Sequence, residues 1–418
     1  MNYSPKAGLR ATLFALLAIL SPTAVIGGEF TTGDAAWTYG IDGGLGYFSF
    51  RDSLFVDIDP DPPGNLSDDW GEIYIKPWIN LEMELGSGEL FGGASYAYAR
   101  TGDDASDIAG GAADSRDFDV LYLGWRYGDA ESGRFEAAGG RLDYTLGKGL
   151  LLADGYADGG SRGGYWSNPR TAWAPGINVR FLSSQHTLEL FYLERDERPE
   201  SDSESRLGGI NYQWSAPAAE LVVGASYFSM KANQLEPQRD GADVWNLRLY
   251  TMPWDLPLSL DTEWVYEDNG QALDANAWYL QPYWTWDEVR WPTVLYYRYA
   301  YFEGDDPDTP ANENYDPLFP GFYDWGSWWQ GEIAGEYLIS NSNLISHMVR
   351  LHTSPTGRIG TGLIWFDFSL DQPGSYQGGV QSDDLGQEIN WYMDWEFHRM
   401  FTLSLVLART EPGRAVEE

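Results

Sequence analysis

The sequence contains no cysteine and only four histidines among its 418 residues. Without cysteine the chain can form no disulfide and can carry out no thiol chemistry. His347 and His352 are five residues apart on one expected strand, so they point to opposite faces and cannot form a metal pair. His186 and His398 fall in expected turns. We therefore expect no enzymatic activity, no metal and no cofactor.

Basic side chains are also scarce, with 26 lysines and arginines against 63 aspartates and glutamates, and the formal net charge is −37. Such an acidic chain repels phosphate backbones, which excludes a nucleic-acid-binding protein. Much of the acidic charge lies in the runs "DIDPDPPG", "DDASD", "RDERPESDSESR" and "EGDDPDTPANENYD". These runs have no ordered metal-ligand spacing, and we interpret them as solvated loop surface.

Long apolar runs are absent except near the N-terminus. There "ATLFALLAIL" follows Lys6 and Arg10 and precedes the small residues of "SPTAVIGG". A helix needs about 18 or more apolar residues to cross a membrane, so this run is too short. The pattern is typical of a secretory signal peptide, residues 1–28, cleaved near Gly27 or Gly28. Residues 29–418 then form a single domain.

The sequence does contain a strict alternation of apolar and polar residues. In "EIYIKPWINLEMEL", residues 72–85, the odd positions are apolar, including Ile73 and Ile79, whereas the even positions are mostly polar. The same period of two recurs in "GINVRFL", "DVWNLRLY", "QEINWYMDWEF" and "MFTLSLVLA". Period two indicates β-strands with one apolar face. Pro77 and Pro282 lack an amide donor, so we expect a bulge or a strand end at each.

The apolar faces indicate a membrane barrel. They carry tryptophan and tyrosine near the strand ends, as at membrane interfaces, and the segments have the length of about 9–13 residues that a tilted membrane strand needs. No strong second apolar face exists that could pack one sheet on another, as a secreted β-sandwich would require. The sequence therefore predicts an all-β, transmembrane antiparallel β-barrel, with about 17 strands between Trp37 and Ala408.

Connections alternate between short and long, as in outer-membrane barrels, where the long loops lie outside. The expected long loops are 52–70, 101–116, 142–174, 195–205, 231–242, 303–343 and 371–385. Within loop 303–343, Trp329, Ile333 and Tyr337 are spaced four apart, which predicts a short helix rather than a strand.

Two regions resemble the alginate export family. They are "YDPLFPGFYDWGSWWQGEIAGEYLISNSNL" with "GQEINWYMDWEFHRMFTLSLVLARTEPGRAVEE", and "GGRLDYTLGKGLLLADGY" with "PRTAWAPGINVRF". The resemblance implies an 18-stranded outer-membrane barrel that passes a polysaccharide outward. It also implies a closing strand after the turn at Pro412 and Gly413, which this sequence does not contain.

We consider three functions: an exporter of alginate or another glycan, a general or substrate-specific diffusion porin, and a structural or adhesive barrel acting through its outer loops. The expected location is the Gram-negative outer membrane. The expected partners are its lipid and lipopolysaccharide, a glycan substrate and periplasmic export machinery. A glycan channel needs aromatic and hydrogen-bonding side chains in its lumen. By parity the candidates are Tyr74, Trp78, Asn80, Glu82, Asn178, Asn246, Tyr250, Tyr283, Asn390 and Tyr392.

The basic residues placed on lumen faces, or at the end of a strand, are Lys76, Arg141, Arg180, Arg248 and Arg298. A channel for an acidic glycan needs clustered cations at its constriction. We expect at least two of these residues to meet the long loop 142–174 there. The alternative for each is an ion pair with a neighbouring lumen carboxylate that braces the strands.

Cysteine labelling tests the assignment of faces. The chain has no cysteine, so a single cysteine placed at Ile79 or at Asn80 is the only reactive thiol. A water-soluble maleimide should label the Asn80 variant, which faces the lumen, and spare the Ile79 variant, which faces lipid. Equal labelling of the two positions would contradict the barrel interpretation of this strand.

Overall fold

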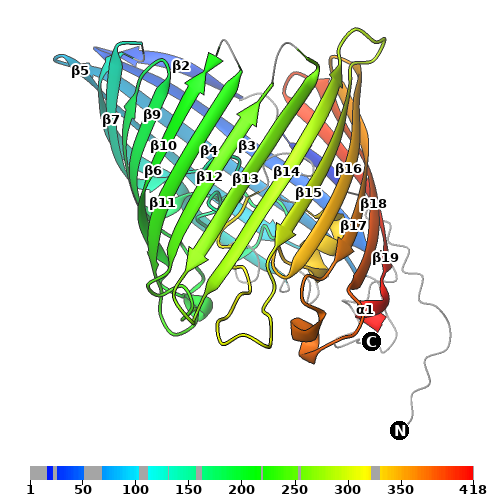
Figure 1. The fold of residues 1–418 in the computed structure, drawn as a ribbon. Coiled ribbons are helices and arrows are strands. Elements are labelled where there is room, and N and C mark those ends of the chain that lie inside the picture. The colour runs from blue at the N-terminus through cyan, green and yellow to red at the C-terminus, as the bar shows by residue number, and fades with distance from the viewer. Residues whose placement is uncertain are drawn as a thin grey trace.

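The chain forms one antiparallel sheet of tilted strands that curves into a barrel (Figure 1). The computed structural model describes residues 17–21, 26–50, 68–102, 112–129, 131–156, 162–217, 220–252, 256–321 and 330–417. The strands are β1 (Leu17–Ser21), β2 (Ile26–Thr32), β3 (Ala35–Phe50), β4 (Asp68–Leu85), β5 (Gly88–Thr101), β6 (Ala113–Asp129), β7 (Gly133–Leu142), β8 (Trp173–Leu182), β9 (His186–Glu194), β10 (Arg206–Ala216), β11 (Leu221–Lys231), β12 (Asp243–Thr251), β13 (Leu258–Asp268), β14 (Asp274–Trp286), β15 (Thr293–Phe302), β16 (Leu344–Thr356), β17 (Ile359–Ser369), β18 (Asp384–His398) and β19 (Phe401–Pro412).

From β2 to β19 each strand pairs with the next in the chain, so the predicted all-β antiparallel barrel is confirmed. The described residues contain nineteen strands, of which two precede Ala35, and this leaves the seventeen expected from the sequence. The strands β3 and β19 do not pair with each other. Between them lies β1, which forms five residue pairs with β19 and the single pair Leu20–Leu45 with β3. Because β1 falls inside the expected signal peptide, the cleavage near Gly27 or Gly28 stays a prediction.

Short turns and long connections lie at opposite ends of the barrel, as the sequence predicted (Figure 1). Here these are called the short-turn end and the long-loop end. The β15–β16 connection holds the helix η6 (Gly331–Leu338), as expected from its four-residue spacing. The 3₁₀ helix η7 (Pro373–Gly378) lies in the β17–β18 connection, and η3 (Pro199–Ser201) lies in the β9–β10 connection. A short helix, α1 (Arg414–Glu417), follows β19. Most of the expected loop 52–70 lies outside the described residues.

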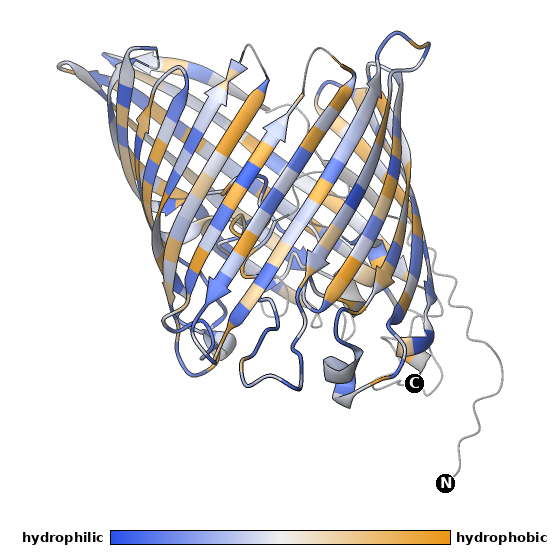
Figure 2. Cartoon of the chain, viewed as in Figure 1, coloured by the Kyte–Doolittle hydropathy of each residue, from blue (hydrophilic) through white to orange (hydrophobic). Residues whose placement is uncertain are grey.

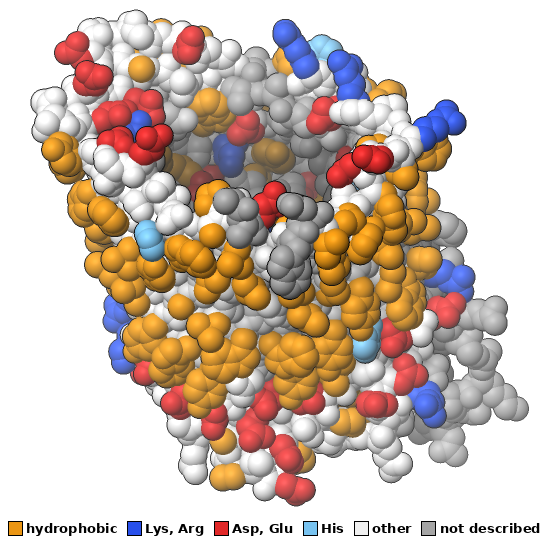
Figure 3. Space-filling model, turned by 45° about the horizontal axis from the view of Figure 1, so that its top comes forward, with side chains coloured by type: hydrophobic (Ala, Val, Ile, Leu, Met, Phe, Trp, Pro, Cys, Tyr) orange, Lys and Arg blue, Asp and Glu red, His pale blue; other side chains and the backbone are white. Residues whose placement is uncertain are grey.

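The outer surface carries the apolar faces of the strands. On β12, Leu247 is 53% exposed, whereas its neighbours Asn246 and Arg248 are 1% and 3% exposed. Hydropathy alternates along the strands (Figure 2), and on the face shown in Figure 3 apolar side chains form a band with charged groups beyond it. In the part of the chain that the structure describes, no helix is long and apolar enough to cross a membrane.

The expectation of a bulge or strand end at Pro77 and Pro282 is wrong. Strand β4 runs through Pro77, and the pairing of β4 with β5 lacks two residue pairs there while the register is unchanged. The pairing of β14 with β15 is interrupted at Pro282 in the same way. A missing amide donor removes ladder hydrogen bonds on one side, and the intact ladder on the other side keeps each strand straight.

The hydrophobic core lies inside the barrel at the long-loop end. Many of its strand residues come from the ends of strands at that side, for example Phe48 of β3, Phe228 of β11 and Phe368 of β17. Loop residues complete it, including Leu151 and Phe319. The opposite, short-turn end is hollow in the space-filling view (Figure 3). The lumen is therefore a polar vestibule that ends at a packed apolar layer.

A charged side chain on the outer face should lower the free energy of unfolding most when it lies near the middle of a strand. Ile79, near the middle of β4, and Leu85, at its short-turn end, are both exposed on the sheet. We expect Ile79→Arg to lower the free energy of unfolding in lipid by about 2–4 kcal/mol and Leu85→Arg by about 0–1 kcal/mol, since the cost falls toward the interface. Denaturant unfolding in bilayers measures both. Equal costs would place Ile79 outside the hydrocarbon.

Candidate functional site

Two long connections fold inward and bind to lumen-facing side chains. The first, here called the first inward loop, is the β7–β8 connection, residues 143–172. On β4, the Glu72 carboxylate accepts backbone hydrogen bonds from Trp166, at 3.0 Å, and from Ser167, at 2.8 Å. On β6, the Asp119 carboxylate accepts from the amides of Thr171 and Ala172 at 2.9 and 3.1 Å. Strand carboxylates therefore hold a loop that would otherwise carry unsatisfied backbone groups.

The β15–β16 connection, residues 303–343, is the second inward loop. Its helix η6 begins beside β18, where the Glu388 carboxylate accepts from the amides of Ile333 and Ala334 at 3.1 and 2.6 Å. The side-chain oxygen of Asn390 accepts from the amide of Glu332 at 3.3 Å. A helix start exposes free N–H groups and partial positive charge, which a carboxylate satisfies.

The two inward loops meet across the lumen. Leu152 and Phe319 form a parallel bridge, the amide of Ala153 donates to the Phe319 carbonyl at 2.9 Å, and the amide of Gly321 donates to the Gly149 carbonyl at 3.0 Å. The rings of Phe319 and Trp173 pack edge to face with centroids 5.5 Å apart. These contacts connect the loops into one internal layer.

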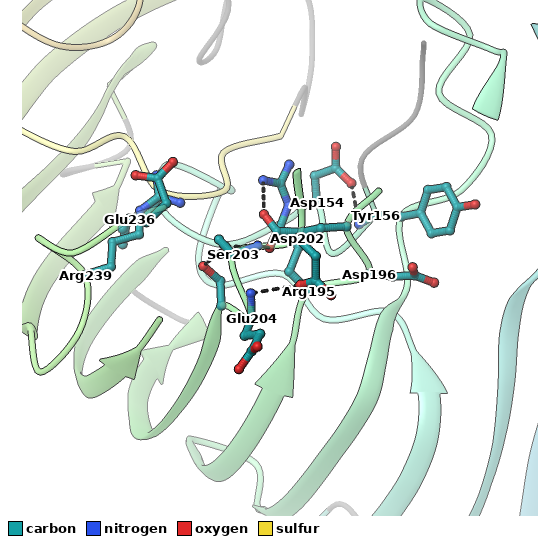
Figure 4. Close-up of polar contacts among 12 residues, drawn as sticks. Asp154, Tyr156, Arg195, Asp196, Asp202, Ser203, Glu204, Glu236 and Arg239 are labelled. Carbon is teal, nitrogen blue, oxygen red and sulfur yellow. Dashed lines mark hydrogen bonds and ion pairs between the residues drawn. The ribbon is translucent and has the colours of Figure 1, made fainter. Parts of the chain in front are cut away.

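Five arginines surround this layer, and we call them the arginine cluster: Arg141, Arg162, Arg170, Arg195 and Arg239. The first three place their guanidinium carbons 6.0, 4.2 and 4.8 Å from the ring centroid of Tyr156. Arg195 and Arg239 lie 4.8 and 5.0 Å from the ring of Phe319. Figure 4 shows part of this region, with Tyr156, Arg195 and Arg239 among the residues drawn.

Carboxylates compensate most of the cluster's charge. Asp196 binds both Arg141 and Arg162, at 2.6 and 2.8 Å. Asp316 holds Arg239 through two hydrogen bonds of 2.6 and 2.7 Å. Glu197 lies 3.5 Å from Arg195. Partly buried charges need such partners, because desolvation of an unpaired ion costs several kcal/mol.

Asp154, in the first inward loop beside this cluster, has a perturbed pKa. Burial raises the pKa of its carboxyl to about 6, although nearby Arg195 acts in the opposite direction. Its carboxylate oxygens accept from the Tyr156 amide at 3.0 Å and from the Asn168 side chain at 3.3 Å. Burial also lowers the pKa of Arg195. Because the pKa of the Asp154 carboxyl is about 6, the charge of this region changes near that pH.

Of the predicted basic residues, Lys76, Arg141 and Arg248 reach the first inward loop. Lys76 donates to the Pro169 carbonyl at 2.9 Å and pairs with Asp119 at 3.1 Å. Arg248 packs so closely on Gly147 that a Cβ there would lie 2.6 Å from its Cδ.

Arg248 has amide and hydroxyl partners. Its guanidinium donates to Ser226 at 2.7 Å, to Asn211 at 2.5 Å and to Asn246. No carboxylate of the described residues forms an ion pair with it.

Arg180 and Arg298 lie elsewhere. Arg180 faces the vestibule and pairs with Glu189 and Glu136, at 2.9 and 3.6 Å, so it braces neighbouring strands. Arg298 is fully buried and lies 3.4 Å from the Gln330 side chain of the second inward loop.

The predicted lumen residues divide by depth. Asn246, Asn390 and Tyr392 are almost fully buried. The hydroxyl of Tyr250 donates to Glu263, and the ring of Tyr283 stacks on Tyr296 with centroids 5.0 Å apart. The more accessible candidates on the lumen faces are Tyr74, Trp78, Asn80, Glu82 and Asn178.

Four arginines of the cluster are not predicted from the sequence, because Arg162, Arg170, Arg195 and Arg239 lie in connections without periodicity. The interpretation of the run at 195–206 as solvated surface holds only in part. Asp202 and Glu204 are exposed, whereas Asp196 and Glu197 pair with arginines of the cluster. The arginines interleaved with the acidic residues were the available sign that this loop forms internal ion pairs.

The chain is similar in structure to porins, although no protein-family model and no curated protein matches its sequence. Acinetobacter baumannii OccAB4 aligns with a TM-score of 0.51 and 13% identity, over 91% of this chain and 98% of that one. Pseudomonas aeruginosa OccK5 (OpdH) aligns with a TM-score of 0.48 and 12% identity, over 97% and 99%. A triple mutant of the Rhodopseudomonas blastica porin aligns with a TM-score of 0.42 and 11% identity, over 89% and 99%. The similarity to OccAB4 supports the barrel fold.

The Asp154→Asn variant tests the perturbed carboxyl. A folded-state pKa raised to about 6 means that the folded protein binds more protons than the unfolded chain between about pH 4 and 6. Stability from this group is therefore lost as pH rises through that window. The free energy of unfolding of Asp154→Asn minus that of the wild type should rise from pH 4 to 6 and then stay level. A difference that is flat across this window would contradict the assignment.

Proposed function

We propose that this protein is an outer-membrane channel that carries an acidic polysaccharide or oligosaccharide through its lumen. The observation that carries the proposal is the arginine cluster, which lies where the two inward loops cross the barrel. Guanidinium groups bind carboxylates through paired, charge-assisted hydrogen bonds and stay charged at any physiological pH. The formal net charge of −37 does not oppose this, because the field inside a narrow lumen depends on nearby groups.

The arrangement supports passage of an acidic glycan by exchange of ion-pair partners. Asp196 and Asp316 already bind arginines of the cluster in the geometry that a uronate carboxylate would take. A passing carboxylate can replace these internal partners one at a time, so no arginine is left unpaired and buried. Side-chain exposures of 21%, 13% and 11% for Arg141, Arg162 and Arg239 leave them reachable.

The lumen also offers groups that suit sugar rings. Tyr283 and Tyr296 are partly exposed and stack, and the Arg350 guanidinium lies 5.1 Å from the Tyr296 ring. Aromatic faces contact the apolar C–H faces of pyranoses, while amides and hydroxyls bond their hydroxyls. Together with the resemblance to the alginate export family, this favours outward transport of a glycan, in cooperation with periplasmic export machinery.

A diffusion porin for small solutes is the second candidate. The vestibule carries ion pairs of the kind that line such pores, for example Arg126 with Glu82 at 2.8 Å. A porin needs only a charged, water-filled lumen and no polymer site. Block by a polymer therefore separates the two functions. A purely structural or adhesive barrel, the third alternative, would conduct poorly and would show neither ion selectivity nor block by a polymer.

Planar-bilayer recording tests the proposal. We expect wild-type protein to prefer anions and to be blocked by oligogalacturonate. Lys76→Gln combined with Arg162→Gln should shift the reversal potential toward cations and weaken the block about tenfold or more, because a hydrogen bond to a charged group contributes about 1.5–3 kcal/mol.

Arg180→Gln is the matched control, since it removes one positive charge from the vestibule, away from the inward loops. It should change the block much less than the double variant does. A wild-type channel that prefers cations and ignores oligogalacturonate would overturn the acidic-glycan function and favour the porin.

A further inference from the structure

A polar pocket of about 400 Å³ opens at the long-loop end, between the β15–β16 and β17–β18 connections. Small-molecule sites typically measure about 300–1,000 Å³, so its size suits a ligand of one or two sugar rings. It contains none of the arginine cluster. The pocket is therefore distinct from the site in the lumen.

The lining is rich in carboxamides and hydroxyls. Its polar members include Asn312, Asn314, Ser340, Asn343, Tyr376 and Gln377. Among the lining residues only Asp305 carries a charge, and there is no lysine or arginine. Amides both donate and accept, which matches the hydroxyls of a sugar.

Asn343 makes one wall rigid. Its side-chain oxygen accepts from the Gln372 amide at 2.7 Å, and its side-chain nitrogen donates to the Gln372 carbonyl at 3.1 Å and to Ser375 at 3.3 Å. Its backbone is left-handed, with φ of +49°. The β17–β18 connection is therefore fixed against the end of the second inward loop before any ligand arrives.

Other polar groups of the pocket are free to bind. The side chains of Asn314 and Ser340 are exposed and form no hydrogen bond within the described residues. Gln377 uses only its nitrogen, which donates to the Tyr376 hydroxyl at 3.1 Å, so its carbonyl oxygen is open. The Tyr376 ring is half-buried and packs against the core, which presents a fixed aromatic surface.

From these observations we infer that this pocket binds a neutral saccharide. An aromatic surface with convergent amides and hydroxyls recognises both the C–H face and the hydroxyl edge of a pyranose. Asp305 lies in the wall, where its carboxylate accepts from the Glu313 amide at 3.1 Å. Its negative charge disfavours a uronate, in contrast to the arginine cluster.

Saturation-transfer NMR on the full-length protein in detergent tests the inference. The probes are the methyl glycosides of glucose, galactose, mannose and N-acetylglucosamine, with methyl glucuronide as the acidic counterpart. At least one neutral glycoside should bind at millimolar concentration, and methyl glucuronide should bind more weakly. Asn314→Ala with Gln377→Ala should weaken binding about 5- to 160-fold, since each of the two lost hydrogen bonds contributes about 0.5–1.5 kcal/mol. Tyr376→Ala should weaken it further.

Gln234→Ala is the matched control, because Gln234 is an exposed amide in the β11–β12 connection. It should leave binding unchanged, and the Asn314→Ala, Gln377→Ala variant should leave the reversal potential of the channel unchanged. No binding of any neutral glycoside, preference for methyl glucuronide, or equal binding by the wild type and the pocket variants would overturn the inference. Loss of anion selectivity in the lumen variants would not affect it.

A second arm identifies the source of the sugar. The bound glycoside is titrated against protein in bilayers with and without lipopolysaccharide. Displacement by lipopolysaccharide would identify its sugar chain as the occupant. Undiminished glycoside binding would identify a soluble glycan, and either result supports a neutral saccharide site.

Discussion

The rest of this structure depends on the pairing of backbone amide and carbonyl groups in a medium without water. Inside hydrocarbon an unpaired group costs several kcal/mol, so strands must pair with neighbours on both sides. This constraint keeps β4 and β14 in register even where a proline removes ladder hydrogen bonds. The same constraint applies at the seam between β3 and β19, which do not pair with each other. There the short strand β1 pairs with both edges.

A polar interior creates a second requirement, because the groups that face inward need partners of their own. The inward loops supply them: Glu72 and Glu388, from strands on either side of the seam, both bind loop amides. The loops in turn bring apolar residues such as Leu151 and Phe319 into the lumen. The long-loop end is thus packed like a soluble protein core, while the short-turn end stays open and wet.

The charges follow from this packing. Arginines beside Tyr156 and Phe319 are held by Asp196 and Asp316, which compensate part of the cluster's charge. In the proposed function these carboxylates exchange places with an arriving anion. The polar pocket at the rim has the opposite character, with amides and no cation among its lining residues. The two proposed sites therefore differ in charge, and we propose the first for acidic and the second for neutral glycans.

The sequence by itself determined the strands, their faces and the two kinds of connection. The alternation with a period of two predicts which side chains of β12 point outward. The lengths of the connections distinguish the two ends of the barrel. What fills the lumen was decided only by tertiary structure, because the contacts that place the inward loops, such as Glu72 with Trp166, join residues 94 positions apart. Arg162, Arg195 and Arg239 meet for the same reason, since loops carry no period from which their position could be read.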